Sequence, residues 1–180
     1  MKDQIEISKY SPCREALKYR LEHPDFKEAW ENCPRGDWML WIAQKAGVDI
    51  HPLTYAKAKC AETVKHLMKD ERSLNAIKVA KKFGKKKAAR KELDAAYAAA
   101  YTAANDAYTA YTAANDAAYT TAATAAAYTA DAYAAYTAAA DDAAADAAAD
   151  DAARHNNRKK TADICRKHLT KHVFKALNIK

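Results

Sequence analysis

The chain has 180 residues, of which only three are glycine and four are proline. This scarcity argues against a sheet-rich fold, which needs many turns, whereas the abundance of alanine favours helix. No segment contains the roughly 18 apolar residues that span a membrane, and the first residues lack the apolar stretch of a signal peptide. The four cysteines form no CxxC pair. We therefore expect a cytoplasmic protein with reduced thiols and no membrane partner.

The formal net charge of +7 conceals an alternating pattern along the chain. Residues 1–93 carry 21 Lys/Arg and 13 Asp/Glu, residues 94–153 carry nine Asp and no basic residue, and residues 154–180 carry nine basic residues and one acid. A basic protein often binds nucleic acid. Here the two basic ends can instead neutralise the acidic middle of the same chain, which weakens that inference.

Residues 1–87 carry the pattern of about five short amphipathic helices. Ser11-Pro12 is a start signal for the first, because it supplies a capping hydroxyl and a proline suited to the first helical position. Asp25 is followed three residues later by Glu28, which resembles a capping box. A second helix is therefore expected to begin after Asp25.

Three more helices follow in the same region. Asp37 is expected to cap a third helix over 38–46, which Gly47 ends. The fourth is predicted over about 51–69, where apolar residues recur every three or four positions. A fifth helix is expected to end at Gly84.

Residues 88–154 have a different character, with an imperfect repeat in which AYTAANDA occupies 100–107 and again 110–117. Alanine makes this low-complexity segment a strong helix former. Most of its tyrosines fall within about 60° of Tyr97 on a helical wheel, namely Tyr101, Tyr108, Tyr111, Tyr119, Tyr133 and Tyr136. This stripe predicts that the tyrosines form a buried face.

A single helix over the whole Ala-rich segment would be about 100 Å long, which is too long for a compact domain. We therefore expect a helical hairpin over 88–154, and the stray phase of Tyr128 places its break near 120–127. Residues 155–180 predict a final basic amphipathic helix, whose apolar stripe consists of Ala162, Cys165, Leu169, Val173 and Ala176. The three regions are expected to form one compact domain.

The stretch from Arg35 to Trp41 is the most distinctive in the chain. Tryptophan and arginine are common anchors of protein interfaces. Tryptophans three residues apart on a helix are equally typical of a core. The candidates for partner binding or for defining the fold are Arg35, Asp37, Trp38 and Trp41.

Two further groups of residues could bind ligands. A basic run could contact an anion, with solvent or the nearby aspartates as the alternative environment, and its members are Lys85, Lys86, Lys87 and Arg90. A weaker metal candidate consists of Cys165, His168 and His172, which lie on adjacent helical turns. No zinc pattern is complete, and the favoured interpretation is that Cys165 is buried and the two histidines flank the core. We predict no catalytic residue and no cofactor.

Several segments together resemble one known family: Cys13, Glu28-Ala29-Trp30, the run from Cys33 to Trp41, Ala58 with Cys60 and Ala61, and the tail Cys165-Arg166-Lys167-His168. With the Ala/Tyr/Asp region between them, they are similar to the immunity-protein-five-like family of bacterial polymorphic-toxin systems, which also occurs in phages. This chain departs from the family pattern in its many lysines and its Tyr-Thr repeats. The resemblance implies a non-enzymatic inhibitor that sequesters a toxin.

Three functional hypotheses follow. The first is a binding protein that neutralises a protein toxin or a defence effector by stoichiometric sequestration. The second is a phage anti-defence sponge, in which tyrosines and the basic ends enclose an anionic nucleotide. The third, and least favoured, is nucleic-acid binding through the lysine run. The oligomeric state stays open, because a Tyr/Ala stripe can pack within one chain or between two.

Overall fold

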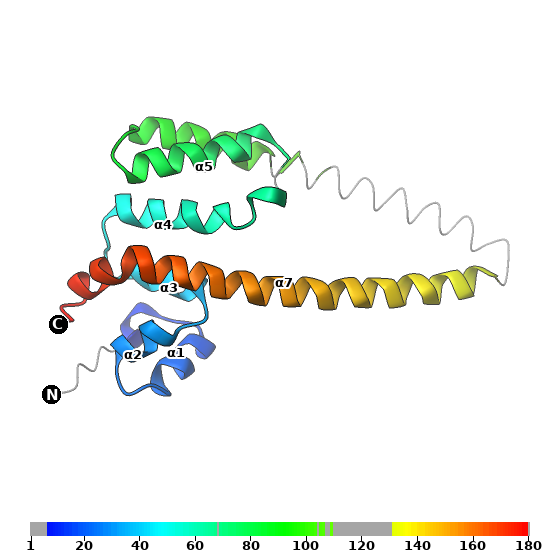
Figure 1. Cartoon of the computed structure of the whole chain (residues 1–180), viewed down its shortest axis with the longest axis horizontal. Coiled ribbons are helices and arrows are strands. Elements are labelled where there is room, and N and C mark those ends of the chain that lie inside the picture. Colours follow the sequence, from blue (N-terminus) through cyan, green and yellow to red (C-terminus); the bar gives the residue numbers. More distant parts are fainter. Residues whose placement is uncertain (1–6, 68, 104, 107–108, 110–130, 180) are drawn as a thin grey trace.

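The structure, a computed structural model, describes residues 7–67, 69–103, 105–106, 109 and 131–179. All regular secondary structure in these ranges is helical, which confirms the predicted all-α class. The labelled elements are η1 (Ile7–Tyr10), α1 (Arg14–Leu21), α2 (Phe26–Asn32), α3 (Gly36–Lys45), α4 (Ile50–Glu62), η2 (Lys65–Leu67), α5 (Glu71–Gly84) and α7 (Asp131–Ala176). A further helix, without a label in Figure 1, covers residues 90–103.

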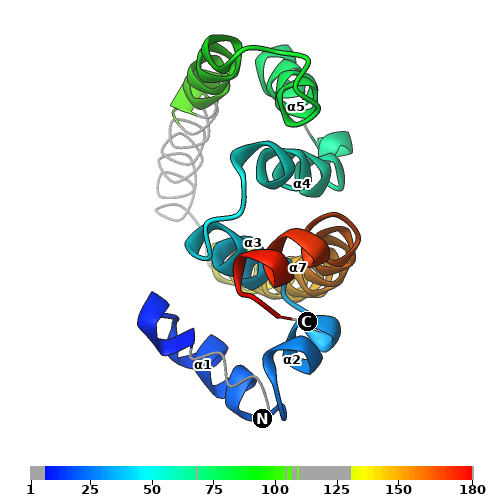
Figure 2. The ribbon, with the colours of Figure 1, turned by 90° about the vertical axis from the view of Figure 1, so that its left-hand side faces the viewer.

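The helices stack in successive layers (Figures 1 and 2). At one end lie α1 and α2, then α3 beside the C-terminal part of α7, then α4, and finally α5 with the helix at 90–103. The helix at 90–103 and α7 run in opposite directions, and the N-terminal part of α7 extends beyond the stack (Figure 1). The predicted break near 120–127 lies outside the described residues.

The core forms where α7 crosses α3 and α4. Four side chains of α7 have no exposed surface and follow helical spacing: Ala162, Cys165, Leu169 and Val173. They are four of the five residues whose periodicity predicts the apolar stripe of the tail, whereas Ala176 is exposed. Burying a leucine or valine side chain stabilises the fold by about 1.5–3 kcal/mol. This stripe therefore anchors α7 to both neighbouring helices.

Gly36, the first residue of α3, allows α7 to approach this closely. A Cβ atom built on Gly36 would lie 2.3 Å from Oγ1 and 2.6 Å from the backbone carbonyl carbon of Thr161. The carbonyl oxygen of Gly36 also accepts a hydrogen bond from the Cys165 thiol, at 3.6 Å. Only glycine leaves room for the α7 backbone at this position.

The helix starts agree in part with the sequence predictions. Asp25 caps α2 as expected, accepting a hydrogen bond from the Glu28 amide at 2.8 Å. The predicted cap at Ser11 is wrong: this residue has a φ of 56° and closes the η1 turn, so α1 begins after Cys13. Asp37 is not a cap either, because α3 begins one residue earlier, at Gly36.

Two helix lengths differ from the predictions. The fourth helix ends at Glu62, not near Lys69, because the Thr63 hydroxyl donates to the Cys60 carbonyl at 2.7 Å and the chain turns into η2. The tail over 155–180 is not a separate helix. It continues the Ala-rich segment in α7, whose 46 residues span about 69 Å.

Two tyrosines of the predicted buried stripe have side chains that the structure describes, and both are exposed. In the helix at 90–103, Tyr97 and Tyr101 are 69% and 60% exposed and stack on each other with ring centres 6.4 Å apart. The buried positions of this helix are Ala96 and Ala103. Alanine permits a closer backbone approach than tyrosine, so the helix packs through its small residues and turns these rings outward.

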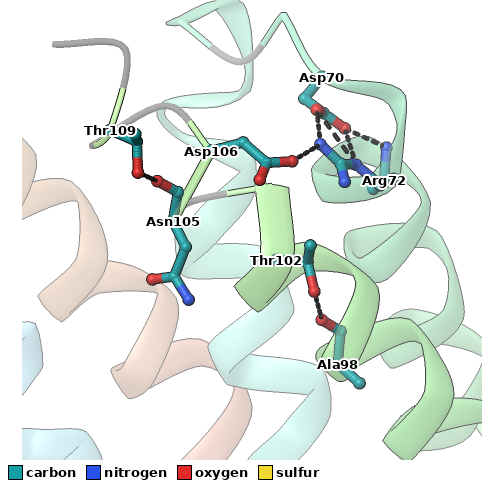
Figure 3. Close-up of polar contacts among 7 residues, drawn as sticks. All are labelled: Asp70, Arg72, Ala98, Thr102, Asn105, Asp106 and Thr109. Atoms are coloured by element: carbon teal, nitrogen blue, oxygen red, sulfur yellow. Dashed lines mark hydrogen bonds and ion pairs between the residues drawn. The ribbon is translucent and has the colours of Figure 1, made fainter. Parts of the chain in front are cut away.

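Arg72 ties the Ala-rich segment to the start of α5 (Figure 3). Its Nη2 atom lies 2.8 Å from a carboxylate oxygen of Asp70 and 2.8 Å from one of Asp106. The two carboxylates raise the pKa of Arg72 above its already high ordinary value. This bridge is a direct contact between the basic first part of the chain and its acidic middle.

Within the described residues, each helix is either too short or too polar to cross a lipid bilayer. The aspartates and threonines spread through the Ala-rich region agree with this result.

We predict that Gly36→Ala lowers the free energy of unfolding by about 1–3 kcal/mol, because the added methyl group forces α7 away from α3. Urea denaturation followed by circular dichroism measures the change. Gly47→Ala is the comparison, since nothing lies within 4 Å of its Cβ and only its φ of +80° opposes the change. Equal stability of Gly36→Ala and the unmodified protein contradicts the prediction.

Candidate anion-binding site

A basic pocket of about 430 Å³ lies where the start of α4, the end of α5 and the last turns of α7 meet. Its lining contains three histidines, four lysines and one tyrosine: His51, Tyr55, Lys85, Lys86, Lys167, His168, Lys171 and His172, together with Pro52 and Gly84. No carboxylate belongs to this described lining. We call this feature the basic pocket.

The α4 side of the pocket is held by a cap. Asp49 accepts a hydrogen bond from the His51 amide at 2.9 Å, and the same oxygen lies 3.0 Å from Nδ1 of the His51 ring. The ring stacks on Phe83 of α5, with centres 4.7 Å apart and an angle of 15° between the planes. Phe83 is buried, so it fixes the imidazole on a rigid support.

Tyr55 is the aromatic centre of the pocket. The His168 ring meets it edge-on with ring centres 5.2 Å apart, and Nζ of Lys85 lies 5.5 Å from the Tyr55 ring centre. Helices α4 and α5 approach closely here: a Cβ atom built on Gly84 would lie 2.5 Å from Cβ of Tyr55. Tyr55 therefore joins α4, α5 and α7 at one place.

The turn after α5 sets the position of the pocket lysines. Lys86 has a φ of 59°, and its amide donates to the Phe83 carbonyl at 2.8 Å. The Lys87 amide donates to the Lys82 carbonyl at 2.8 Å, which completes a helix-ending turn. A left-handed conformation is unusual for lysine and costs about 1–2 kcal/mol, yet it places Lys85 and Lys86 at the pocket.

Asp49 offsets part of the positive charge at the pocket through its pair with His51, whereas the four lysines are unpaired within the described part of the chain. None of Lys85, Lys86, Lys167 and Lys171 forms an ion pair with a described residue. Burial, followed by the positive field of Lys167 and Lys59, lowers the pKa of His168. Burial and then Lys171 lower the pKa of His172, against a smaller opposing effect of Asp49. The charges of the four pocket lysines are therefore left without an ion-pair partner among the described residues.

Such an arrangement suits a phosphate-bearing ligand. Lysine ammonium groups bind phosphate as point charges, and histidine adds donors whose charge varies near neutral pH. A volume of about 430 Å³ lies in the range of small-molecule sites. The rings of Tyr55 and His51 supply apolar surface for a flat group beside the phosphate.

The structure separates the predicted anion-contacting residues. Lys85 and Lys86 line the basic pocket, and Lys87 lines a neighbouring cleft. Arg90 lies 2.8 Å from the carboxylate of Asp94 in its own helix, so its charge is already matched.

Arg35, Asp37 and Trp38 interact with one another. The Arg35 guanidinium contacts the Asp37 carboxylate at 2.9 and 2.6 Å and lies 4.5 Å from the Trp38 ring centre. This ion pair holds the pKa of Asp37 below its usual range. Trp38 and Trp41 are half-buried and line a cavity of only about 50 Å³. The cluster braces the junction of α2 and α3.

Two side chains of α7 form hydrogen bonds with this junction. Arg166 donates to the Cys33 carbonyl at 2.7 Å and pairs with Asp163 at 2.6 Å. The Trp30 indole donates to the Thr170 hydroxyl at 2.9 Å. Segments more than 130 residues apart in the chain are therefore joined by hydrogen bonds as well as by apolar packing.

The predicted metal trio is divided between two environments. Cys165 is fully buried beside Cys60 and Gly36, and the hydrogen bond with Cys60 raises its thiol pKa. His168 and His172 instead line the basic pocket. Among the described residues, no three histidines, cysteines or carboxylates lie close enough together to hold a metal ion.

Four charged or aromatic residues of the pocket were not among the sequence candidates: His51, Tyr55, Lys167 and Lys171. The tail did contain a signal, because Lys167, His168, Lys171 and His172 recur at helical spacing and share one face. No comparable signal in the sequence joins this face to α4.

No protein-family model, curated protein or solved structure matches the chain. Membership of the immunity-protein-five-like family therefore stays a prediction. The segments that suggested it, around Cys33 and around Cys165, lie against each other at the contact between α3 and α7.

We predict that Trp38→Ala lowers the free energy of unfolding by about 2 kcal/mol, since a half-buried ring and its contacts with Arg35 and Tyr19 are lost. Trp38→Phe, which keeps an aromatic ring, should lose less than half as much. Urea denaturation of the three proteins tests this order. A Trp38→Ala variant as stable as the parent would remove Trp38 from the fold-defining residues.

Two of the three pocket histidines, His168 and His172, should make stability depend on pH. Their pKa values are lowered in the folded protein, so the unfolded chain binds more protons as the pH falls below about 6.5. The free energy of unfolding should therefore decrease between pH 7.5 and 5.5. The charged groups that act on the two rings are Lys59, Lys167, Lys171, Lys175 and Asp49.

Urea denaturation at several pH values measures this slope. The double variant His168→Gln/His172→Gln should flatten it, whereas His155→Gln, at an exposed position elsewhere on α7, should leave it unchanged. A slope that is the same in all three proteins would exclude the pocket histidines as its source.

Proposed function

We propose that this protein is a non-enzymatic binding protein that sequesters an anionic, phosphate-bearing small molecule in the basic pocket. The observation that carries the proposal is the convergence of four lysines and three histidines from three helical regions, without a carboxylate in the described lining. The four lysine ammonium groups repel one another, and a bound anion would offset that repulsion. Folded proteins tolerate such local conflicts chiefly at functional sites.

A nucleotide is the class of ligand that fits this chemistry best. Its phosphate groups match the lysines, and its base matches the Tyr55 and His51 rings that border them. Base stacking on an aromatic side chain contributes about 1–3 kcal/mol, which allows a modest pocket to bind usefully tightly. This is the second of the sequence hypotheses, a sponge for an anionic nucleotide.

We propose that the lysines bind a phosphate equally strongly in its ground state and in any transition state, so that the protein binds its ligand and does not catalyse a reaction. Uniform binding of this kind retains a ligand without accelerating a reaction. Stoichiometric sequestration then requires only that the protein be abundant relative to its ligand.

Neutralisation of a protein toxin or defence effector is the second candidate. It rests on the family resemblance and on Arg35, Asp37, Trp38 and Trp41 as contact residues. Arg35 already contacts Asp37 and Trp38, so its charge is less available to a partner than the unpaired lysines of the basic pocket. The geometry therefore favours the nucleotide.

A thermal-shift panel of nucleoside monophosphates, nucleoside diphosphates, cyclic nucleotides and inorganic phosphate tests the proposal. A ligand present at 100 times its Kd stabilises the protein by about 2.7 kcal/mol, which should raise the Tm by about 5–10 °C. Lys86→Ala/Lys171→Ala should weaken binding at least tenfold. Lys18→Ala/Lys27→Ala removes the same charge from α1 and α2 and should leave binding unchanged.

Two outcomes would count against the nucleotide. A flat panel contradicts it and favours a protein partner, to be sought with Trp38 and Arg35 variants in capture experiments. Equal loss of binding in the two double-lysine variants would show that net charge, and not the basic pocket, attracts the ligand.

A further inference from the structure

A second basic feature adjoins the pocket. A cleft of about 370 Å³ runs between α5 and the end of α4, and six lysines line it: Lys65, Lys78, Lys81, Lys82, Lys85 and Lys87. Leu74 and Ile77 form its apolar part, and Glu62 is its one acidic residue. We call this feature the lysine cleft.

The single carboxylate of the lysine cleft is already engaged. Glu62 pairs with Lys81 and, on its other oxygen, with Lys59. These two ammonium groups hold the pKa of Glu62 below its usual range, despite the opposing effect of burial. Lys78, Lys82 and Lys87 are exposed and form no ion pair with a described residue. After the Glu62–Lys81 pair is counted, the lysine cleft still carries a net positive charge.

The acidic middle of the chain does not supply the missing charge where the structure describes it. The two described aspartates of that region with ion pairs, Asp94 and Asp106, contact Arg90 and Arg72. Neither partner lines the lysine cleft or the basic pocket. These two acids are therefore paired with arginines and not with lysines of the pocket or the cleft.

The lysine cleft and the basic pocket share one lining residue, Lys85. Lys78 and Lys82 of α5 and Lys85 at its C-cap recur at helical spacing and span about 10 Å. A single phosphate cannot reach along this row. Several consecutive phosphates of one chain can, and each lysine then meets its own anion.

From the shared Lys85 and this row of lysines we infer that the ligand is a chain of phosphate groups, which begins in the basic pocket and extends along the lysine cleft. The inference rests on the proposed function, and it extends the ligand class from a single nucleotide to a chain of linked phosphates whose first member occupies the basic pocket. Single-stranded oligonucleotides and inorganic polyphosphate share this chemistry. Both would gain affinity with each phosphate that reaches a lysine of the cleft.

The experiment measures Kd against chain length. Thymidine monophosphate is compared with oligothymidylates of four and eight nucleotides and with inorganic polyphosphate of matching phosphate number, at 50 and 200 mM salt. We expect the eight-nucleotide chain to bind at least tenfold more tightly than the monophosphate at 50 mM salt. Its affinity should also fall more steeply with salt, by a slope of about 0.7 for each phosphate contacted.

Matched variants locate the effect. Lys78→Ala/Lys82→Ala/Lys87→Ala changes only the lysine cleft, and should abolish the gain with length while leaving the affinity for the monophosphate within about twofold. Lys9→Ala/Lys18→Ala/Lys27→Ala removes equal charge from exposed positions in η1, α1 and α2 and should keep the full gain. Circular dichroism confirms that both triple variants are folded.

The outcomes separate this inference from the proposed function. A monophosphate that binds as tightly as the longer chains overturns the inference and leaves the nucleotide pocket intact. No binding of any probe overturns both. Equal gains with oligothymidylate and polyphosphate support recognition of phosphate alone, whereas a gain with oligothymidylate only supports added stacking of bases in the basic pocket.

Discussion

The close approach of α7 to the first turn of α3 is the constraint on which the remaining arrangement depends. Gly36 leaves no space for a side chain against Thr161, and the Cys165 thiol and the Arg166 guanidinium donate to the carbonyls of Gly36 and Cys33. The stripe of fully buried residues on α7 follows from this contact. Because α7 is one rigid helix, fixing it at α3 also fixes which of its side chains face α4. The histidines two turns further along thereby reach the start of α4.

The distribution of charge gives this packing its functional interest. Both basic ends of the chain contribute to the basic pocket, through the end of α5 and through α7. The described aspartates of the acidic middle that form ion pairs contact Arg72 and Arg90, which lie outside that pocket. The four unpaired lysines of the basic pocket are the observation on which the proposed anion binding rests.

In the helix at 90–103, the buried residues are alanines and the tyrosines face the solvent. Ala96 and Ala103 are buried, while Tyr97 and Tyr101 are exposed and stack on each other. Periodicity identifies a face on which side chains of one kind gather, but it does not say which way that face turns. Aromatic residues usually bury more area than alanine, which is why the opposite orientation was the natural expectation. Here the close approach of helices at alanine outweighs that preference.

The sequence by itself determined the helical class, the apolar stripe of the tail, the Asp25 cap and the glycine that ends α3, because these features depend on neighbours within a few residues. It also identified Lys85, Lys86 and His168 as candidates, although as separate groups. Only the tertiary structure placed Cys165 in the core and His168 in a pocket with Tyr55 and Lys171. These placements depend on contacts between residues more than 100 positions apart, such as Gly36 with Thr161. A backbone approach of this kind has no counterpart in local pattern, since it depends on the shape of both partners at once.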